Sequence, residues 1–283
     1  ESAERLSKSV VGSSLVKAAM FGSDANWGRV LCAMGYSKAP FRPEFVDVKF
    51  RSVVGEVLVC RQGAGVDFDE AYSSPFSPTT QLYYGDDLQE IAFGMKEIDE
   101  PGVNFIYQSG VTQLLGFIVE KATGEKLSDY VSRKLWTPMH AEESALWSLD
   151  RKDGMEKAYC CFNSNARDFA RFGQLLLNNG QWDGQQLISP AYLAEATSPD
   201  TRLVYKDLGK PNHCYGFQYW ILDYKGMKIP YMRGILGQYV FTLPEKNAVI
   251  VRLGHKRSDT YTADQHYPDD INTWLDAAMD LLQ

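Results

Sequence analysis

Tyr107 and Ser109 bring two hydroxyl groups within two residues of each other, just before a segment with helical hydrophobic spacing. Pro101-Gly102 is a turn-forming pair, residues 105–107 form a short apolar run, and Ser109 can cap a helix that starts near Gly110. Hydroxyls held at the head of a packed helix could move protons beside a nucleophile. The same pattern also fits a buried tyrosine in front of an ordinary helix. The chemical interpretation therefore needs a nucleophile elsewhere in the chain.

Ser14 and Lys17 are candidates for that nucleophile and its base. Side chains at i and i+3 share one face of a helix, which places the lysine amine beside the serine hydroxyl. The amine can accept the hydroxyl proton if burial or a neighbouring cation lowers its pKa. A Ser-x-x-Lys spacing also arises by chance in a chain with many serines. Ser14 as nucleophile, with Lys17 as its base, is therefore a hypothesis.

The segments around these residues alternate between helical and extended patterns. Helices are predicted over residues 1–34, with breaks at 12–14 and 22–24, and over 86–96, 110–123, 127–135, 165–178, a short segment after Ser189-Pro190, and 269–282. Strands are predicted over 45–50, 56–60, 215–222, 228–233, 238–243 and 248–253, with a hairpin turn at 245–247 and a loop over 72–80. This order indicates an α+β fold, with an antiparallel sheet flanked by helices and an α+β N-terminal segment.

Two of the predicted helices carry expectations about single side chains. The helix after Tyr107 has one apolar stripe expected to face the core, made of Leu114, Leu115, Ile118, Val119 and Ala122. Gly124 should end that helix. In the helix over 165–178, Asp168 and Arg171 stand at i and i+3, which is typical of an ion pair on a helix surface.

Composition limits the classes of function. The chain has 283 residues, enough for one large domain or two small ones. A net charge of -7, with no run rich in Lys and Arg, argues against broad nucleic-acid binding. No apolar run approaches the length of a membrane span. The first residues include neither Met nor an apolar leader, as expected for a processed or trimmed piece.

The cysteines and histidines do not form a metal-binding pattern. The five cysteines are an odd number, contain no CxxC and include one adjacent pair, Cys160 and Cys161. Buried free thiols are therefore expected rather than a disulfide framework or a zinc site. The four histidines are scattered without HxxxH spacing. We predict no metal and no cofactor.

Residues 71–283 resemble the C-terminal part of the serine β-lactamase, penicillin-binding protein and esterase superfamily. The resemblance is closest to its less specialised amidases and carboxylesterases. It is carried, in order, by Tyr-Gln-Ser at 107–109, Thr-Gln-Leu-Leu-Gly at 112–116, Ala-Leu-Trp-Ser-Leu-Asp at 145–150, Ala-Tyr-Cys-Cys-Phe-Asn at 158–163, Arg-Asp-Phe-Ala-Arg-Phe-Gly at 167–173 and Arg-Gly-Ile-Leu-Gly-Gln at 233–238.

Residues 1–70 resemble a different family, the ornithine/glutamate N-acetyltransferase of arginine synthesis. The resemblance is to an internal segment and is carried by Ser-Leu-Val-Lys-Ala-Ala at 14–19, Phe-Gly-Ser-Asp-Ala-Asn-Trp-Gly-Arg at 21–29, Val-Leu-Val at 57–59, Gly63 and Val-Asp-Phe-Asp-Glu at 66–70. That family cleaves itself and uses the new N-terminal threonine as nucleophile. Glu1 is not Thr, so the chain is expected to lack that nucleophile. The sequence thus predicts a composite of two regions, 1–70 and 71–283, with the junction near residues 65–71.

The hydrolase resemblance implies acyl transfer through a covalent serine ester. Ser14 would attack and Lys17 would be the base, while Tyr107 would relay the proton to the leaving group and Ser109 would complete the hydrogen-bond chain. One oxyanion-hole N–H would come from the nucleophile and another from the strand near Gln238 or Tyr239. The family's periplasmic location is also implied.

The third motif of the β-lactamases, Lys-Thr-Gly or a His variant that meets a substrate carboxylate, is absent here. The nearest text contains Arg233, which could bind substrate as a cation or be a structural arginine at a strand end. Arg233, Gly237, Gln238 and Tyr239 are the predicted substrate-binding residues. A small neutral ester or amide is the expected substrate. The alternatives are an inactive or engineered composite scaffold and a fragment of the acetyltransferase, and the oligomeric state is left open.

Overall fold

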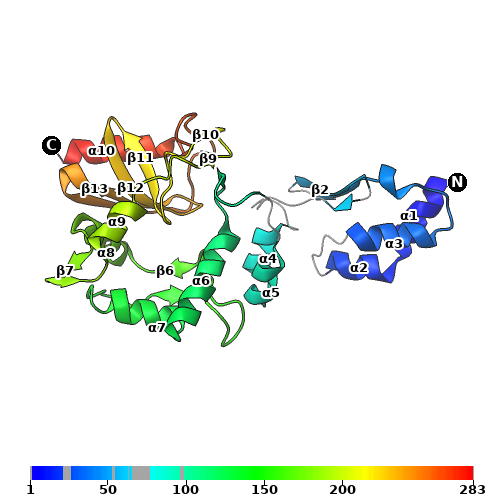
Figure 1. Cartoon of the computed structure of the whole chain (residues 1–283), viewed down its shortest axis with the longest axis horizontal. Coiled ribbons are helices and arrows are strands. Elements are labelled where there is room, and N and C mark those ends of the chain that lie inside the picture. Colours follow the sequence, from blue (N-terminus) through cyan, green and yellow to red (C-terminus); the bar gives the residue numbers. More distant parts are fainter. Residues whose placement is uncertain are drawn as a thin grey trace. The chain divides into compact units, whose positions relative to one another are not determined.

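The computed structural model describes residues 2–21, 27–52, 55–62, 64–65, 77–95 and 99–282 (Figure 1). The chain divides into two compact units, each with its own hydrophobic core. Unit 1 consists of Glu1–Ile98, Gln108–Ile118 and Leu149–Tyr159, and unit 2 consists of Asp99–Tyr107, Val119–Ser148 and Cys160–Gln283. The predicted junction, from residue 66 onwards, lies outside the described residues, so the boundary between 70 and 71 stays a prediction.

The N-terminal part of unit 1 packs three helices and a small antiparallel sheet. Its elements are α1 (Ser2–Gly12), α2 (Ser14–Phe21), α3 (Trp27–Tyr36), a 3-10 turn (Pro43–Phe45), β1 (Val48–Ser52), β2 (Gly55–Arg61) and β3 (Ala64–Gly65). Val16, Ala33 and Cys60 are among its buried core residues. The predicted helices are confirmed, and the break near residue 13 is a single residue. The predicted break at 22–24 lies outside the described residues.

A second cluster of unit 1 forms around α4 (Pro78–Tyr84) and α5 (Leu88–Gly94), where Leu82 and Leu88 are buried. Asp87 caps α5, since its side chain accepts a hydrogen bond from the Glu90 N–H at 2.9 Å, and the helix predicted over 86–96 is confirmed for residues 88–94. The prediction of a loop over 72–80 was wrong for its last residues, because α4 begins at Pro78. Ser77 caps it by accepting from the Thr80 N–H at 3.2 Å, a Ser-Pro start that the sequence contained.

The helix after Tyr107 is α6 (Ser109–Thr123). It ends at Gly124 as predicted, and Gly124 has a φ of 71°. Gly102, in the turn upstream of Tyr107, also has a positive φ, of 79°. The predicted buried stripe was wrong in part, because Leu115 and Ile118 are 42% and 61% exposed. Gln113 is buried in their place. Its amide donates to the Glu156 carbonyl at 3.2 Å and accepts from the Ala158 N–H at 2.9 Å, so a polar anchor sets this face of the helix.

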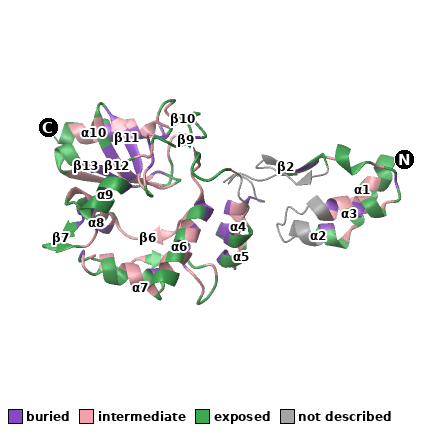
Figure 2. Ribbon diagram, in the orientation of Figure 1, coloured by how far each residue is buried: buried purple, intermediate pink, exposed green. Residues whose placement is uncertain are grey.

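Unit 2 is built on a four-stranded antiparallel sheet. The strands follow chain order as β11 (Trp220–Tyr224), β12 (Met227–Arg233), β13 (Gln238–Leu243) and β14 (Ala248–Leu253). Figure 2 shows buried residues along these strands. Three strands begin close to their predicted positions, but β11 begins at Trp220 and not at Tyr215. The chain turns between Tyr215 and Trp220, because Gln218 has a φ of 64° and an antiparallel bridge joins Tyr215 to Trp220.

Two helices cover opposite faces of this sheet. Side chains alternate across a strand, so the two sides of β13 contact different partners. Phe241 is fully buried in one cluster with Ile271 and Leu275 of α10 (Asp270–Leu281). On the other side, Val240 and the β14 residue Val249 approach α8 (Ala166–Leu177) at Gly173. The predicted α+β class, an antiparallel sheet flanked by helices, is confirmed.

Short elements complete unit 2 and position the segment before Tyr107. β4 (Asn104–Phe105) pairs in parallel with β9 (Val204–Tyr205), which pairs with β10 (Lys210–Pro211). The others are α7 (Leu127–Val131), a π-helical turn (Ser132–Trp136), β5 (Leu146–Trp147), β6 (Phe162–Asn163), β7 (Gln181–Trp182), β8 (Gln185–Gln186), α9 (Pro190–Ala196) and a 3-10 turn (Pro244–Lys246). Among the described residues, no helix combines the length and apolar character needed to cross a membrane.

Candidate functional site

Tyr107 is held by aromatic packing within unit 2. β4 fixes Phe105 against β9, and Phe105 stacks on Tyr215 with ring centroids 4.8 Å apart. Two residues later, the Tyr107 ring meets the edge of Tyr215 at 5.6 Å and the Trp220 ring at 5.2 Å. Tyr107 is half-buried and α6 begins two residues beyond it. The Tyr107 ring is therefore held within unit 2 by its aromatic neighbours, and a phenol held in this way suits a proton-relay role.

Arg233 contacts the same indole from the end of β12. Its Cζ atom is 3.4 Å from the centroid of the Trp220 ring, which is a close cation–π contact. Its Nη1 donates to the His266 carbonyl at 2.9 Å and more weakly to the Tyr231 hydroxyl at 3.4 Å. The hydrogen bond to the His266 carbonyl and the stacking on Trp220 support a structural role for Arg233. Substrate binding by its half-buried cation stays a prediction. Trp220 thus brings Tyr107 and Arg233, two of the predicted site residues, against one side chain.

His266, whose carbonyl accepts from Arg233, also has side-chain contacts of its own. Its backbone has a φ of 52°, and its Nδ1 lies 2.7 Å from the Tyr205 hydroxyl and 3.9 Å from a carboxylate oxygen of Asp207. Burial lowers the pKa of His266, and the Arg233 cation lowers it further, while Asp207 opposes both. The neutral imidazole is therefore favoured beside the guanidinium. Sequence reasoning missed His266, because only the fold brings a loop before α10 to the end of β12.

The turn between β12 and β13 contains the remaining predicted substrate-binding residues. Gly237 is buried at a φ of 86°, and its carbonyl accepts from Arg252. The Gln238 amide donates to the Gly254 carbonyl at 2.6 Å and accepts from the Leu236 N–H at 3.1 Å. Tyr239 is 1% exposed, and burial raises the pKa of its phenol to about 12. The Gln238 side chain thus stabilises the turn, and the Tyr239 side chain is part of the core. Substrate binding by this turn stays a prediction, and it would rely on backbone groups.

Ser14 and Lys17 lie on α2 in unit 1, and both side chains are exposed. Ser13 immediately precedes this helix, and its hydroxyl accepts from the Val16 N–H at 3.3 Å while its carbonyl accepts from the Lys17 N–H at 3.0 Å. Ser109 also belongs to unit 1 and is buried, whereas Tyr107 belongs to unit 2. The catalytic grouping of the four residues therefore stays a prediction.

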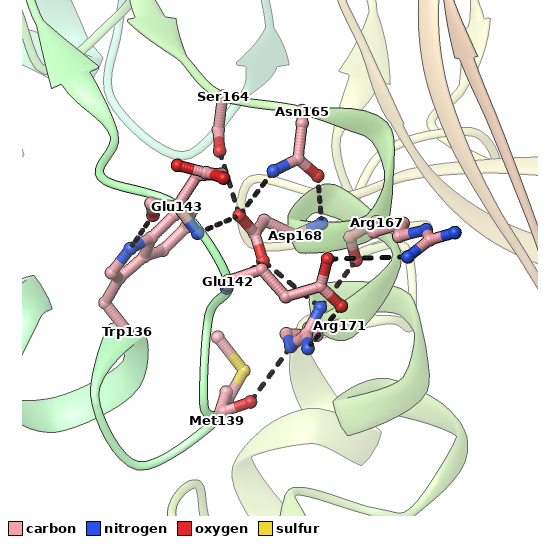
Figure 3. Close-up of polar contacts among 9 residues, drawn as sticks. All are labelled: Trp136, Met139, Glu142, Glu143, Ser164, Asn165, Arg167, Asp168 and Arg171. Carbon is pink, nitrogen blue, oxygen red and sulfur yellow. Dashed lines mark hydrogen bonds and ion pairs between the residues drawn. The ribbon is translucent and has the colours of Figure 1, made fainter.

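Asp168 forms the most densely bonded polar cluster of unit 2 (Figure 3). The prediction of a surface pair with Arg171 was wrong, because Asp168 is fully buried and the Arg171 side chain is only 18% exposed. The carboxylate accepts from the N–H groups of Glu142 and Glu143 at 2.7 and 3.1 Å and from the Asn165 amide at 2.7 Å. It also pairs with Arg171 at 3.1 Å.

These donors control the ionisation of Asp168. Burial by itself would raise its pKa, but the two backbone N–H groups, the Asn165 amide and the Arg171 cation together lower the pKa below the ordinary 3.8. Asn165 is the helix cap of α8, and its own side chain accepts from the Asp168 N–H at 2.9 Å. An asparagine followed three residues later by an acidic residue is a capping signal that the sequence contained. The cluster joins α8 to the loop over 139–143 and is structural.

The expectation of free thiols was wrong at one place. Cys160 and Cys161 form a disulfide between adjacent residues. Cys60 and Cys214 are buried free thiols and Cys32 is exposed. Burial raises the pKa of the Cys214 thiol to about 11. In the described part of the chain, no group of three or more His, Cys, Asp or Glu side chains is arranged to hold a metal ion.

Two family models match the chain, one in each part. A model of the ArgJ family matches residues 1–82, and a model of the beta-lactamase family matches residues 62–270. The N-terminal part is 56% identical over 63 residues to an arginine biosynthesis bifunctional protein ArgJ of Clostridium acetobutylicum, covering 22% of this chain and 15% of that protein. It is 51% identical over 69 residues to the ArgJ protein of Thermotoga neapolitana, covering 24% and 17%. The chain thus spans less than a fifth of the length of these relatives.

Solved structures resemble the other part. A structure assigned as a 6-aminohexanoate-dimer hydrolase from Bacillus anthracis matches with a TM-score of 0.62 and 25% identity, covering 77% of this chain and 56% of that one. A structure assigned as a β-lactamase from Bacteroides dorei matches with a TM-score of 0.51 and 17% identity, covering 68% and 62%, which shows a shared fold alone. The chain is a composite with an ArgJ-family N-terminal segment. Because the beta-lactamase model matches well over half of its residues, the chain belongs to the beta-lactamase family.

Proposed function

We propose that the protein is a serine hydrolase that acts on a small neutral ester or amide through an acyl-serine intermediate. The observation that carries this proposal is the packing of Tyr107 and Arg233 against one indole, Trp220, at 5.2 and 3.4 Å. An orienting aromatic wall with a phenol and a cation is suited to a small substrate whose leaving group must receive a proton. The similarity to a structure assigned as a 6-aminohexanoate-dimer hydrolase supports a hydrolase function.

The proposed reaction begins with attack of the Ser14 hydroxyl on the substrate carbonyl carbon, while Lys17 accepts the hydroxyl proton. Tyr107 passes a proton to the leaving alcohol or amine as the bond to it breaks, and Ser109 extends the hydrogen-bond chain. Backbone N–H groups of the turn near Gln238 would bind the oxyanion. Water then cleaves the acyl-serine ester and returns the serine hydroxyl. Each step uses residues of this chain and no cofactor.

Covalent labelling tests the proposal directly. The purified chain and a Ser14→Ala variant would be treated with a fluorophosphonate probe, and the modified peptide would be identified by mass spectrometry. Hydrolysis of 4-nitrophenyl acetate would be measured in parallel. We expect one adduct on Ser14 and loss of both adduct and hydrolysis in the variant. An adduct on another serine, with hydrolysis retained in Ser14→Ala, would remove Ser14 from the mechanism while leaving the hydrolase class intact.

A catalytically inactive scaffold is the second candidate, and the exposure of Ser14 and Lys17 favours it. Catalytic groups usually line a cleft that encloses most of a small substrate, whereas both of these side chains are exposed on α2. The absence of any fluorophosphonate adduct, together with no ester hydrolysis above the buffer rate, is the outcome expected for this candidate.

An acyltransferase fragment is the third candidate, favoured by the match of residues 1–82 to the ArgJ family. The matched segment covers 15% of the Clostridium acetobutylicum protein, so most of that protein has no counterpart in the match. The test is transfer of an acetyl group from acetylornithine to glutamate, followed by mass spectrometry of the products. Formation of acetylglutamate that depends on the chain would support this candidate over hydrolysis.

A further inference from the structure

We propose that Cys160 and Cys161 form a reversible thiol–disulfide exchange site in the folded protein, and that its exchange partner is a small dithiol. The two cysteines are bonded to each other although they are adjacent in sequence, and both are partly exposed. Of the remaining described cysteines, Cys60 and Cys214 are buried and Cys32 is exposed. Neither Cys160 nor Cys161 is among the residues proposed for hydrolysis.

The backbone around the pair is fixed by hydrogen bonds to both cysteine carbonyls. The Cys160 carbonyl accepts from the indole N–H of Trp147 at 3.1 Å. The Cys161 carbonyl accepts from the Ser148 N–H at 3.2 Å and from the Asn163 amide at 2.9 Å. These donors come from β5 and the residue after it, and from β6 on the other side. The peptide between the two cysteines is therefore hydrogen-bonded to β5, to the residue after it and to β6.

Cys161 has a φ of 66°, a left-handed conformation that residues with a Cβ seldom adopt. The bond between neighbouring sulfurs constrains the backbone of both residues, so opening it frees Cys161 to return to a more common conformation. Such a change would turn the 160–161 peptide and move the carbonyl that Trp147 contacts. Trp147 also packs edge-on against Phe162, with ring centroids 5.1 Å apart. Its fluorescence should therefore report the redox state of the pair.

The exchange reaction balances with a dithiol as reductant. A thiolate of the dithiol attacks one cysteine sulfur and displaces the other, which gives a mixed disulfide. The second thiol of the reagent then closes on the mixed disulfide and releases the first cysteine. The reagent is oxidised to a cyclic disulfide, and the two electrons and two protons that it loses end on Cys160 and Cys161 as thiols. Oxidised glutathione, itself reduced to two thiols, drives the pair back.

Counting alkylated cysteines in the native protein tests this site. The full chain would be treated with excess cyclic oxidised dithiothreitol, which leaves no lasting mixed disulfide on a single thiol such as Cys32. It would then be desalted, alkylated with iodoacetamide and analysed by intact mass and peptide mapping. We expect label on Cys32 alone, because it is the exposed free thiol. After a brief treatment with dithiothreitol, we expect added label on Cys160 and Cys161. Cys214 should stay unlabelled in both states, since it is buried and its thiol has a raised pKa.

Each other result overturns the proposal. Label on all three of Cys32, Cys160 and Cys161 after the oxidant would show that the pair does not form a bond. Label on Cys32 alone after dithiothreitol would show that the bond is closed to exchange. A Cys160→Ser variant supplies a matched control, because Cys161 should then react without any reductant. The tryptophan emission of the wild type should change with redox state, and Trp147→Phe should abolish that change.

Discussion

The guanidinium of Arg233 stacks on the indole of Trp220 with its Cζ 3.4 Å from the ring centroid, and the Tyr107 ring contacts that indole at 5.2 Å. Trp220 is 4% exposed, so the cation lies against a largely dry surface. Cation–π contacts gain strength when water is excluded, up to about 2 kcal/mol. This contact ties the end of β12 to the segment that leads into α6.

We expect Arg233→Met to lower the free energy of unfolding of unit 2 by about 1–3 kcal/mol, because it removes both the stacking and the donor to the His266 carbonyl. Arg233→Lys should fall between the wild type and Arg233→Met. Urea denaturation followed by tryptophan fluorescence measures the change. Arg202→Met is the control, since Arg202 is 87% exposed and its pair with Asp200 should contribute little. Equal stability of Arg233→Met and wild type would show that the stack is not structural.

Tyr107→Phe separates chemistry from packing. The variant keeps the ring that contacts Tyr215 and Trp220 but lacks the hydroxyl, so the aromatic packing is retained. If the phenol relays a proton, kcat for ester hydrolysis should fall by about 100-fold, the lower end of general acid–base effects. Tyr192→Phe is the control, at an exposed tyrosine far along the chain. Unchanged kcat in Tyr107→Phe would exclude Tyr107 as the relay.

The sequence predicted the sheet of unit 2 well because its strands alternate clearly and end at strong turn residues. It failed where a polar side chain replaced the expected apolar contact. The spacing in α6 favoured Leu115 and Ile118 as buried, but Gln113 anchors the helix through two backbone hydrogen bonds. Hydrophobic periodicity considers only apolar residues, so it cannot identify the Gln113 amide, whose partners lie more than forty residues away.

The candidate site was predicted only in part for a related reason. Tyr107 could be selected from its local context, whereas its contact with Trp220, and through it with Arg233, depends on strand pairing that brings distant segments together. Asp168 was misjudged because its i+3 arginine suggested a surface pair. Two of its donors are main-chain N–H groups of residues 142 and 143, and their position cannot be read from residue types.

Asp168→Asn should lower the free energy of unfolding by about 2–4 kcal/mol, since a buried group that now carries an N–H₂ must face N–H donors, and Arg171 keeps only Glu142 as a carboxylate partner. Chemical denaturation would measure this loss. Arg167→Met provides the comparison, because Arg167 is 82% exposed and 3.7 Å from Glu142 and should contribute less than about 0.5 kcal/mol. A similar small effect for both variants would mean that the cluster is not what holds α8 to its loop.

The lowered pKa of His266 predicts a pH dependence of stability. Its ordinary value is 6.5, and burial favours the neutral ring in the folded state. As the pH falls below about 6.5, the unfolded chain binds a proton at this histidine more readily than the folded chain. The free energy of unfolding therefore decreases until the pH reaches the pKa of His266 in the folded state. Above 6.5 the ring is neutral in both states, and His266 no longer makes the free energy of unfolding depend on pH. His266→Asn should remove this part of the acid destabilisation, and asparagine tolerates the local φ of 52°. Identical pH profiles of stability for the variant and wild type would contradict the prediction.

At Gly173, α8 lies close against Val249 of the sheet. A Cβ at this position would lie 2.5 and 2.9 Å from the two methyl carbons of Val249, so an alanine forces a shift between helix and strand. Alanine improves helix propensity by about 1 kcal/mol, but overpacking costs about 1–3 kcal/mol, so Gly173→Ala should be destabilising on balance. In a Val249→Ala background both Val249 methyls are gone and only Val240 Cγ1, at 3.3 Å, still crowds the new Cβ, so the same substitution should be much less destabilising. Thermal unfolding of the four proteins in this cycle measures the coupling.

Gly94→Ala, where nothing lies within 4 Å of the new Cβ, is the control. A Gly173→Ala effect that is the same in both backgrounds would show that contact with Val249 is not the reason for glycine here.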